Sequence, residues 1–267
     1  MALTTASQLI SPKVNFSALK DSFLSAEPFD HVVIDDFFLP EIADGLAAEF
    51  PTFESDIWAE YNNPLEIKKT SNNWNKFPTL TYSVFSFLNS DEFVGEMSKL
   101  TGDPLYPDTG LHGGGWHTHR PGGKLNTHLD YSIHPKLKLE RRLNLIVYIA
   151  PNWVPEWGGK LGLWEVDTDG RTPGKLAQEI DCLFNRAVIF DTSQNSWHGL
   201  PEPVRSPEGI NRNSLATYYL CEPRKEAAER GRALFAPTDS QKGNAEIEEL
   251  IKLRSGVNTS ESVYRKP

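Results

Sequence analysis

The segment LNLIVYIA, residues 143–150, is a run of apolar and β-branched side chains that only one asparagine interrupts. Such a short apolar run, flanked by charged and turn-forming residues, is typical of a buried β-strand. Similar runs recur on both sides of it, separated by Gly, Pro, Asn and Asp: Leu125–Tyr131, Lys160–Val166, Gln178–Phe184, Ala187–Asp191 and Ser214–Cys221. Many short strands with frequent turns predict a mainly β core, built as a β-sandwich or jelly roll.

We place this core at about residues 106–221. Before it, the sequence predicts an extension of both helices and strands over residues 15–105. The segment HVVIDDFF, His31–Phe38, is typical of a strand, and LPEIADGLAAEF after it predicts a short helix that ends before Pro51. A second helix is expected at Asp91–Leu100, where Thr101 and Gly102 follow as a stop signal.

The polar tail over residues 222–267 predicts one helix, Asn244–Arg254, packed on the outside of the core. Its last dozen residues are expected to be mobile. Because no linker divides the sequence, we expect residues 1–267 to form a single α+β domain, with helices at both ends of the β core.

Composition limits the function classes. The 267-residue chain has 39% hydrophobic and 24% charged residues, as an ordinary globular protein has. No apolar run is long enough to span a membrane, and no secretory signal is evident, so we expect a cytoplasmic protein. The two cysteines, Cys182 and Cys221, are too few for a disulfide scaffold.

The formal net charge is −9, which disfavours nucleic acid as a partner because phosphate backbones need a positive surface. Two short basic clusters, Arg141-Arg142 and Arg224-Lys225, are interpreted as solvated faces.

The segment THLDYS contains a candidate metal pair. In a strand, His128 and Asp130 project from the same face, because residues two apart do so. An imidazole beside a carboxylate supplies two ligands of the 2-His-1-carboxylate triad that suits Fe(II) and leaves three coordination positions open. The pair alone is a weak signal, since chance often produces it in a chain with seven histidines.

His198 is the candidate third ligand. It follows a strand that ends at Asp191, and Trp197, Gly199 and Pro201 place it in a constrained turn. From there we expect it to reach across the sandwich to the first pair.

Arg212 and Ser214 open the strand SLATYYL and face the same side of it. A guanidinium can bind a carboxylate through two parallel hydrogen bonds, and a hydroxyl can assist. 2-Oxoglutarate needs such an anchor, because its 1-carboxylate and keto oxygen chelate iron while its distal carboxylate lies further away. The order His-x-Asp, His, Arg-x-Ser on successive strands is a much stronger signal than any of its parts.

The remaining pattern, LHGGGWHTHRPGG, contains His112, His117 and His119, and His134 follows it. The glycine run indicates a close-packed turn, and we do not expect a second metal site there. The roles of His112, His117 and His134 stay open.

With these motifs, residues 111–220 resemble the prolyl-4-hydroxylase-like branch of the 2-oxoglutarate and Fe(II)-dependent oxygenases. RRLNLIVYIAPNWVPEWGGKLGLWE is similar to a segment of its ribosomal prolyl-hydroxylase subgroup, which has paired arginines, a strand ending in Tyr, a Trp and then GG-x-L. The resemblance implies a double-stranded β-helix core. It also implies that Tyr148 lies near 2-oxoglutarate. The subgroup has a tyrosine where this chain has His119, and two interpretations stay open: His119 hydrogen-bonds the cosubstrate instead, or it is unrelated to that role.

The resemblance implies a dioxygenase that binds Fe(II) through His128, Asp130 and His198 and uses 2-oxoglutarate, with ascorbate as a possible reductant. It would hydroxylate an unactivated C–H bond and release succinate and CO2. Because Asp130 keeps a carboxylate on the metal, no position remains for a halide, and hydroxylation is favoured over halogenation.

The substrate stays open. A small molecule, such as an amino-acid or sugar derivative, is our first hypothesis, and a prolyl residue of a peptide or protein is the alternative. The aromatic segments Tyr61–Trp74 and Trp153–Trp164 are candidate pocket walls. A hypothesis of another class is a cupin-like metal-binding jelly roll without oxygenase activity, and Arg212 would discriminate it from the first two.

Overall fold

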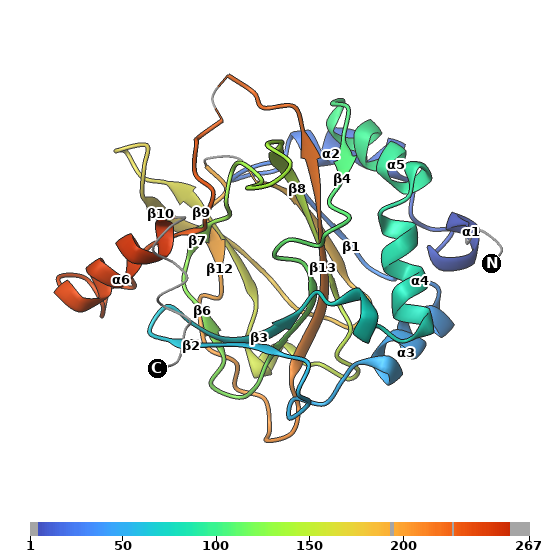
Figure 1. The fold of residues 1–267 in the computed structure, drawn as a ribbon, viewed down its shortest axis with the longest axis horizontal. Coiled ribbons are helices and arrows are strands. Elements are labelled where there is room, and N and C mark those ends of the chain that lie inside the picture. Colours follow the sequence, from blue (N-terminus) through green and yellow to red (C-terminus); the bar gives the residue numbers. More distant parts are fainter. Residues whose placement is uncertain (1–4, 193–194, 226, 257–267) are drawn as a thin grey trace.

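The computed structural model describes residues 5–192, 195–225 and 227–256. Two antiparallel sheets form its core (Figure 1). The larger sheet has the order β1 (His31–Ile34), β11 (Ala187–Asp191), β8 (Glu140–Tyr148), β13 (Arg212–Cys221), β5 (Gly115–His119), β3 (Glu66–Ser71) and β2 (Ala59–Asn63). The short strand β4 (Tyr106–Pro107) pairs with β13, and β6 (Lys124–Leu125) pairs with β3.

The smaller sheet has the order β10 (Pro173–Ile180), β9 (Leu161–Val166), β12 (His198–Gly199), β7 (His128–Leu129) and β14 (Leu234–Phe235). Residues of both sheets line one pocket between them. These features confirm the predicted jelly roll and the mainly β fold class with flanking helices.

Strand β8 explains why its sequence is apolar almost without interruption. Leu143, Leu145 and Val147 pack into the main hydrophobic cluster together with the N-terminal helices. Tyr148 and Ile146 belong instead to a second cluster, which lies between the sheets. A strand covered on both faces needs apolar side chains on both, and alternation with polar residues is therefore lost.

Helices cover the outer face of the larger sheet. They are α1 (Ala6–Leu9), α2 (Phe16–Leu24), α3 (Pro40–Glu49), α4 (Thr79–Leu88) and α5 (Asp91–Thr101). The Ser90 side chain accepts a hydrogen bond from the Phe93 backbone N–H at the start of α5, and Gly102 ends this helix at φ 82°. These two caps explain why its bounds agree with the prediction.

Several further elements were not expected, among them the helices α2 and α4 and the strands β2, β3 and β5. α4, with the sequence TLTYSVFSFL, is rich in β-branched and aromatic residues that favour strands. It is helical because Val84, Phe85 and Leu88 pack into the main cluster, so tertiary burial outweighs local preference.

The remaining elements are the 3-10 turns η1 (Trp74–Lys76) and η2 (Pro155–Trp157) and the C-terminal helix α6 (Ala245–Ser255). α6 is confirmed as a helix, and Figure 1 shows it far from the N-terminal helices. The last dozen residues begin with Gly256 and otherwise lie outside the described residues. Within the described ranges, no helix combines the length and apolar character needed to cross a membrane.

We expect Leu145→Ala to destabilise the protein by about 2–5 kcal/mol, because it leaves a cavity between the larger sheet and the helices. Urea unfolding followed by circular dichroism measures this change. The exposed Lys175→Ala on β10 is the matched control and should shift the unfolding free energy by less than about 0.5 kcal/mol. Equal effects of the two substitutions would contradict this description of the core.

Candidate active site

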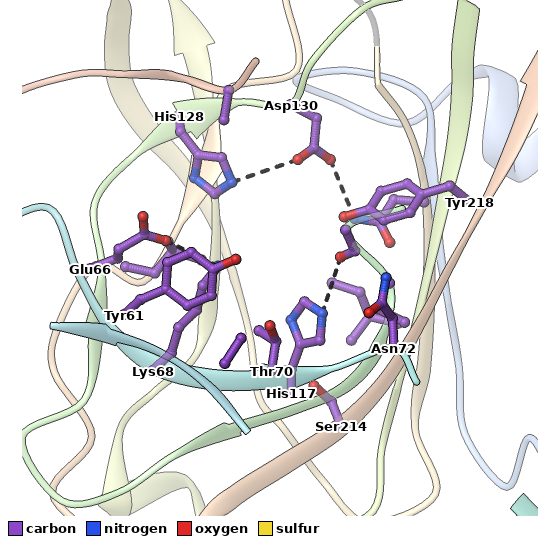
Figure 2. A pocket seen from close by; sticks show the side chains of 18 of the residues that line it. Tyr61, Glu66, Lys68, Thr70, Asn72, His117, His128, Asp130, Ser214 and Tyr218 are labelled. Carbon is purple, nitrogen blue, oxygen red and sulfur yellow. Dashed lines mark hydrogen bonds and ion pairs between the residues drawn. The ribbon is translucent and has the colours of Figure 1, made fainter. Parts of the chain in front are cut away.

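A cavity of about 430 Å³ lies between the two sheets. Figure 2 shows side chains from β2 and β3 (Tyr61, Lys68) on one side of it, with His128 and Asp130 opposite. This volume is in the range of small-molecule binding sites.

Three buried side chains meet at one wall of this cavity. His128 Nε2 lies 3.9 Å from Asp130 Oδ1, and His198 Nε2 lies 3.8 Å from Asp130 Oδ2. Of the described residues, these are the group of His, Cys, Asp or Glu whose potential ligand atoms come within 4.8 Å of one another.

The backbone brings the two histidines together. His198 on β12 is the direct antiparallel partner of His128 on β7, so both lie in the smaller sheet and their ring centroids are 4.3 Å apart. The expectation that His198 reaches across the sandwich was therefore wrong, because the two residues are neighbours within one sheet. Asp130 follows directly after β7, which ends at Leu129.

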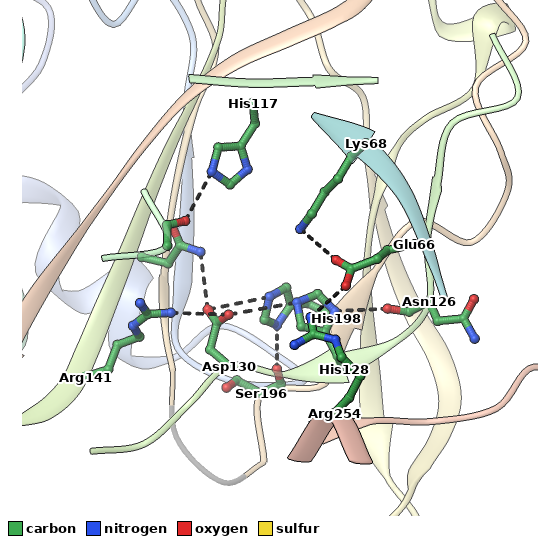
Figure 3. Close-up of polar contacts among 12 residues, drawn as sticks. Glu66, Lys68, His117, Asn126, His128, Asp130, Arg141, Ser196, His198 and Arg254 are labelled. Atoms are coloured by element: carbon green, nitrogen blue, oxygen red, sulfur yellow. Dashed lines mark hydrogen bonds and ion pairs between the residues drawn. The ribbon is translucent and has the colours of Figure 1, made fainter. Parts of the chain in front are cut away.

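Each ring is oriented by a carbonyl two residues before it. His128 Nδ1 lies 2.9 Å from Asn126 O, and His198 Nδ1 lies 2.8 Å from Ser196 O (Figure 3). A carbonyl only accepts, so both Nδ1 atoms carry the proton and both Nε2 lone pairs are left for another partner.

Burial and nearby charges also set the protonation states of His128, His198 and Asp130. Burial is the main cause that lowers the pKa of His128 to about 3, and it lowers the pKa of His198 as well. For Asp130, burial alone would raise the pKa, but the positive charge of Arg141 and the two histidines outweigh it and lower the pKa. Neutral imidazoles beside a carboxylate are the ionisation states that a divalent metal requires.

Arg141 holds the carboxylate from behind. Its Cζ lies 3.4 Å and 3.3 Å from the ring centroids of Tyr131 and Tyr218, which enclose the guanidinium. Its Nη1 is 3.4 Å from Asp130 Oδ1, and its Nη2 donates to His112 O at 2.6 Å. Arg141 therefore positions Asp130 without being exposed itself.

The interpretation of the basic clusters as solvated faces was wrong for three of their four residues. Arg141 and Arg142 are buried, and Arg142 pairs with Asp191. Arg224 is half-buried and donates from two of its nitrogens to Glu140. A charged pair that directly continues an apolar strand was the available signal, because a strand covered on both faces has no solvated side.

Arg212 lies at the base of the cavity. Its Nε donates to Gly159 O at 2.7 Å and to Cys182 Sγ at 3.1 Å, and its Nη2 donates to Tyr148 Oη at 3.3 Å. All three partners are neutral. Within the described ranges, no carboxylate pairs with this buried guanidinium. Sequence reasoning did not anticipate the contact with Cys182, since a lone cysteine carries no positional signal.

Gly159 allows the close packing around Arg212 at the bottom of the cavity. Its φ is 62°, and a Cβ atom there would lie 2.9 Å from Val204 and 3.0 Å from the Arg212 side chain. A glycine is therefore required for the carbonyl to approach Arg212.

His119 lies beside Arg212 in the register of β5 and β13. Neither ring nitrogen has a hydrogen-bond partner in the described residues, although the side chain is buried. Burial, with the nearby charge of Arg212, lowers its pKa well below the usual value and keeps it neutral. Two unpartnered nitrogens at a cavity wall are costly unless a ligand satisfies them.

Ser214 and Tyr148 are direct partners on β13 and β8, and both are buried. The structure therefore places both near Arg212, as the sequence predicts. Figure 2 shows Ser214 close to His117, its register partner on β5.

His117 and His134 have hydrogen-bond partners within the protein. His117 Nε2 lies 3.1 Å from Gly113 O, and His134 Nδ1 accepts from the Lys136 and Leu137 backbone N–H groups. The glycine run allows the close approach at this turn: a Cβ on Gly115, at φ 91°, would lie 2.2 Å from Ser71 O.

The C-terminal segment closes the cavity. Phe235 on β14 stacks on His128, with the ring centroids 5.1 Å apart, and Arg254 Cζ lies 5.2 Å from the Phe235 ring centroid. Arg254 Nη2 then donates to Glu66 Oε1 at 2.6 Å (Figure 3). The expected outside helix thus contributes a buried arginine to the pocket wall, which its weak amphipathicity did not predict.

The two segments that were predicted as pocket walls contribute differently to the cavity. Tyr61, Lys68 and Thr70 of the first segment line the cavity. In the second segment, Leu161 lines the cavity, whereas Trp153 and Trp157 pack into the cluster between the sheets.

Comparison with known proteins identifies the core. Residues 114–220 match the family model of the 2OG-Fe(II) oxygenase superfamily. Over these residues, which are fewer than half of the chain, the sequence is similar to that superfamily. The match includes all three residues of the triad and Arg212, and it confirms the resemblance described from the sequence.

Individual relatives of this oxygenase core agree. The chain is 26% identical to mouse (Mus musculus) prolyl 3-hydroxylase OGFOD1 over 199 residues, which is 73% of the chain and 33% of the relative. It thus spans about a third of that relative's length. A Pseudomonas putida prolyl-4-hydroxylase has the same fold with a TM-score of 0.56 and 15% identity, over 78% of this chain and all of that one.

A third similar fold is SnoK, a non-haem α-ketoglutarate-dependent carbocyclase from nogalamycin biosynthesis. Its TM-score is 0.54 at 13% identity, over 93% of this chain and 94% of that one. At such identities these two structures support the jelly-roll fold and do not determine the substrate of this oxygenase core.

We expect Arg254→Met to destabilise the protein by about 3 kcal/mol, because it removes one partner of a buried ion pair with Glu66. The double variant Glu66→Gln/Arg254→Met should be destabilised by less than the sum of the two single variants, because either single substitution already breaks this pair. Urea unfolding measures all three. Lys252→Met, on the exposed side of the same helix, is the control. Additive effects in the double variant would contradict a direct pairing.

Proposed function

We propose that this chain is an Fe(II)- and 2-oxoglutarate-dependent hydroxylase. In this proposal His128, Asp130 and His198 hold the metal, and Arg212 anchors the distal carboxylate of 2-oxoglutarate. The observation that carries the proposal is the buried Arg212 guanidinium without a carboxylate partner at the base of the same cavity as the triad. A buried charge is stable when an opposite charge satisfies it, and the bound cosubstrate supplies one.

The residues fit a metal ion. Two neutral imidazoles present Nε2 lone pairs next to one carboxylate, and the carbonyls of Asn126 and Ser196 fix both rings. Two histidines and one carboxylate are the ligand set of non-haem Fe(II) oxygenases. Arg141 fills the role of the group that orients the carboxylate ligand.

The residues also fit 2-oxoglutarate. Arg212 supplies a charge-assisted donor, and Ser214, Tyr148 and His119 supply hydroxyl and imidazole groups around it. The unpartnered nitrogens of His119 gain a use in this complex, as a neutral donor or acceptor toward the cosubstrate.

With Fe(II), 2-oxoglutarate and dioxygen bound, the metal centre supplies the oxidation, in which 2-oxoglutarate becomes succinate and CO2 and one oxygen atom enters a substrate C–H bond. The protein binds and orients the reactants for this step. Phe235, stacked on His128, and the ion pair of Arg254 with Glu66 exclude water from that side of the site.

For the substrate, we propose a small molecule such as an amino-acid or sugar-type compound, because the cavity is only partly open and limited in volume. A prolyl residue in a peptide is the second candidate. The similarity to the mouse prolyl 3-hydroxylase over 199 residues supports it. The cupin-like alternative gives no account of a buried Arg212 without a carboxylate partner.

Anaerobic titration with Fe(II) and 2-oxoglutarate should produce the weak visible charge-transfer band of the chelate. His198→Ala should abolish the band through loss of a metal ligand. Arg212→Gln should raise the 2-oxoglutarate concentration for half-saturation about 100-fold, since it removes a buried charged partner. The exposed Arg171→Gln is the matched control and should titrate as the wild type does. No band in the wild type would refute the proposed function.

Succinate release distinguishes the two substrate classes. We expect free amino acids or related small molecules to stimulate succinate formation in the wild type, because a compact cavity accepts a whole small molecule. The measurement compares these compounds with blocked proline-containing peptides at equal concentration. Stimulation by the peptides alone would overturn the small-molecule hypothesis and favour the prolyl one.

A further inference from the structure

The cavity is basic although the chain is acidic. Five of its lining residues are cations: Lys68, Arg141, Arg212, Arg232 and Arg254. Among the described residues that line it, only Glu66 and Asp130 are acids. The chain as a whole carries a formal net charge of −9, so this excess of positive charge is local. Bound Fe(II) and the 2-oxoglutarate dianion carry opposite and equal charge, and together they leave the excess unchanged.

Three of the five cations are neutralised by a carboxylate in the structure or in the proposed function. Arg141 holds Asp130, and Arg254 pairs with Glu66. Arg212 is reserved for the cosubstrate in the proposed function.

The remaining two cations are Lys68 and Arg232. Lys68 Nζ lies 3.3 Å from Glu66 Oε2, but Glu66 carries one charge and already pairs with Arg254. Arg232 is half-buried and has no ion pair or hydrogen bond with a described residue. These cations come from opposite sides of the site, since Lys68 lies on β3 of the larger sheet and Arg232 lies just before β14 of the smaller one.

The charge of Arg232 reaches into the cavity. Burial first, and then positive charges including Arg141 and Arg232, lower the pKa of His112 to about 4. His112 also lines the cavity, so Arg232 adds to its positive potential. In a partly enclosed space such a potential favours an anion and disfavours a cation.

No carboxylate of the described lining is left for a cationic group. Asp130 faces the proposed metal and Arg141, and Glu66 faces two cations. A compound with a net positive charge entering here would meet uncompensated like charge.

We propose that Lys68 and Arg232 form a subsite for an anionic group of the substrate, a carboxylate or a phosphate. The inference rests on the proposed function, because it assigns these two cations to the molecule that is oxidised. It deepens that function: the substrate is an acidic small molecule, and cationic compounds are excluded. Tyr61, over whose ring Lys68 Nζ lies at 5.4 Å, gives this subsite an aromatic wall.

Benzoate, benzamide and benzamidine test the proposal, because they share one shape and differ in charge. Each is titrated by calorimetry into the anaerobic complex with Fe(II) and saturating 2-oxoglutarate, and the visible band reports that the cosubstrate stays bound. We expect benzoate to bind at least about tenfold more tightly than benzamide, and benzamidine to bind most weakly.

Arg232→Gln and Lys68→Gln should each reduce the preference for benzoate over benzamide to about threefold or less. Both variants should keep the charge-transfer band, since neither residue contacts the triad. Arg171→Gln again serves as the control for loss of one exposed positive charge. Absence of benzoate binding to the wild type, a preference for benzamidine, or an undiminished benzoate preference in both variants would each overturn the proposal.

The experiments distinguish failure of the anion subsite from failure of the proposed function. A visible band without a benzoate preference removes the anion subsite and leaves the proposed hydroxylase intact. Without a band, the proposed function fails. The same calorimetric series on the metal-free protein still decides the subsite through Lys68→Gln and Arg232→Gln, because benzoate bound at Arg212 instead would keep its preference undiminished in both variants.

Discussion

The candidate site depends on one backbone pairing, that of His198 with His128. Both residues lie on strands only two residues long, and the register of these strands alone brings the imidazoles to 4.3 Å. A shift by one residue would turn one imidazole to the opposite face of the sheet. Gly199 supports the register, because a Cβ there would lie 2.9 Å from the Thr127 backbone. The chemistry therefore rests on local packing of two very short strands against longer neighbours.

The buried guanidinium groups differ in how far the protein neutralises their charge. The interior holds several guanidinium groups, and the protein treats them differently: Arg141 receives a carboxylate and two aromatic faces, whereas Arg212 receives only neutral acceptors. The charge of Arg141 is neutralised within the protein itself. The charge of Arg212 is neutralised only when a carboxylate from a ligand is added. Because a buried charge without a partner is costly, this difference indicates a ligand site at Arg212.

The sequence predicted the jelly roll and the residues of the candidate site because both follow local rules. Apolar runs mark the strands, and His128, Asp130 and Arg212 occur in short, ordered motifs on them. It did not predict α4, whose helix is a product of packing. It also did not predict the burial of Arg141, which lies between Tyr131 and the sequence-distant Tyr218. The contribution of Arg254 was missed for the same reason: it meets Glu66 across 188 positions of the chain.

The placement of α6 has a consequence for how such a chain can diversify. The proposed metal ligands and Arg212 lie on or next to strands of the sheets, whereas a helix outside the jelly roll supplies part of the cavity wall. Insertions or substitutions in this tail can reshape the entrance while the strand register stays untouched. Evolution, or an engineer, can therefore alter which molecule enters independently of the machinery that reacts with it.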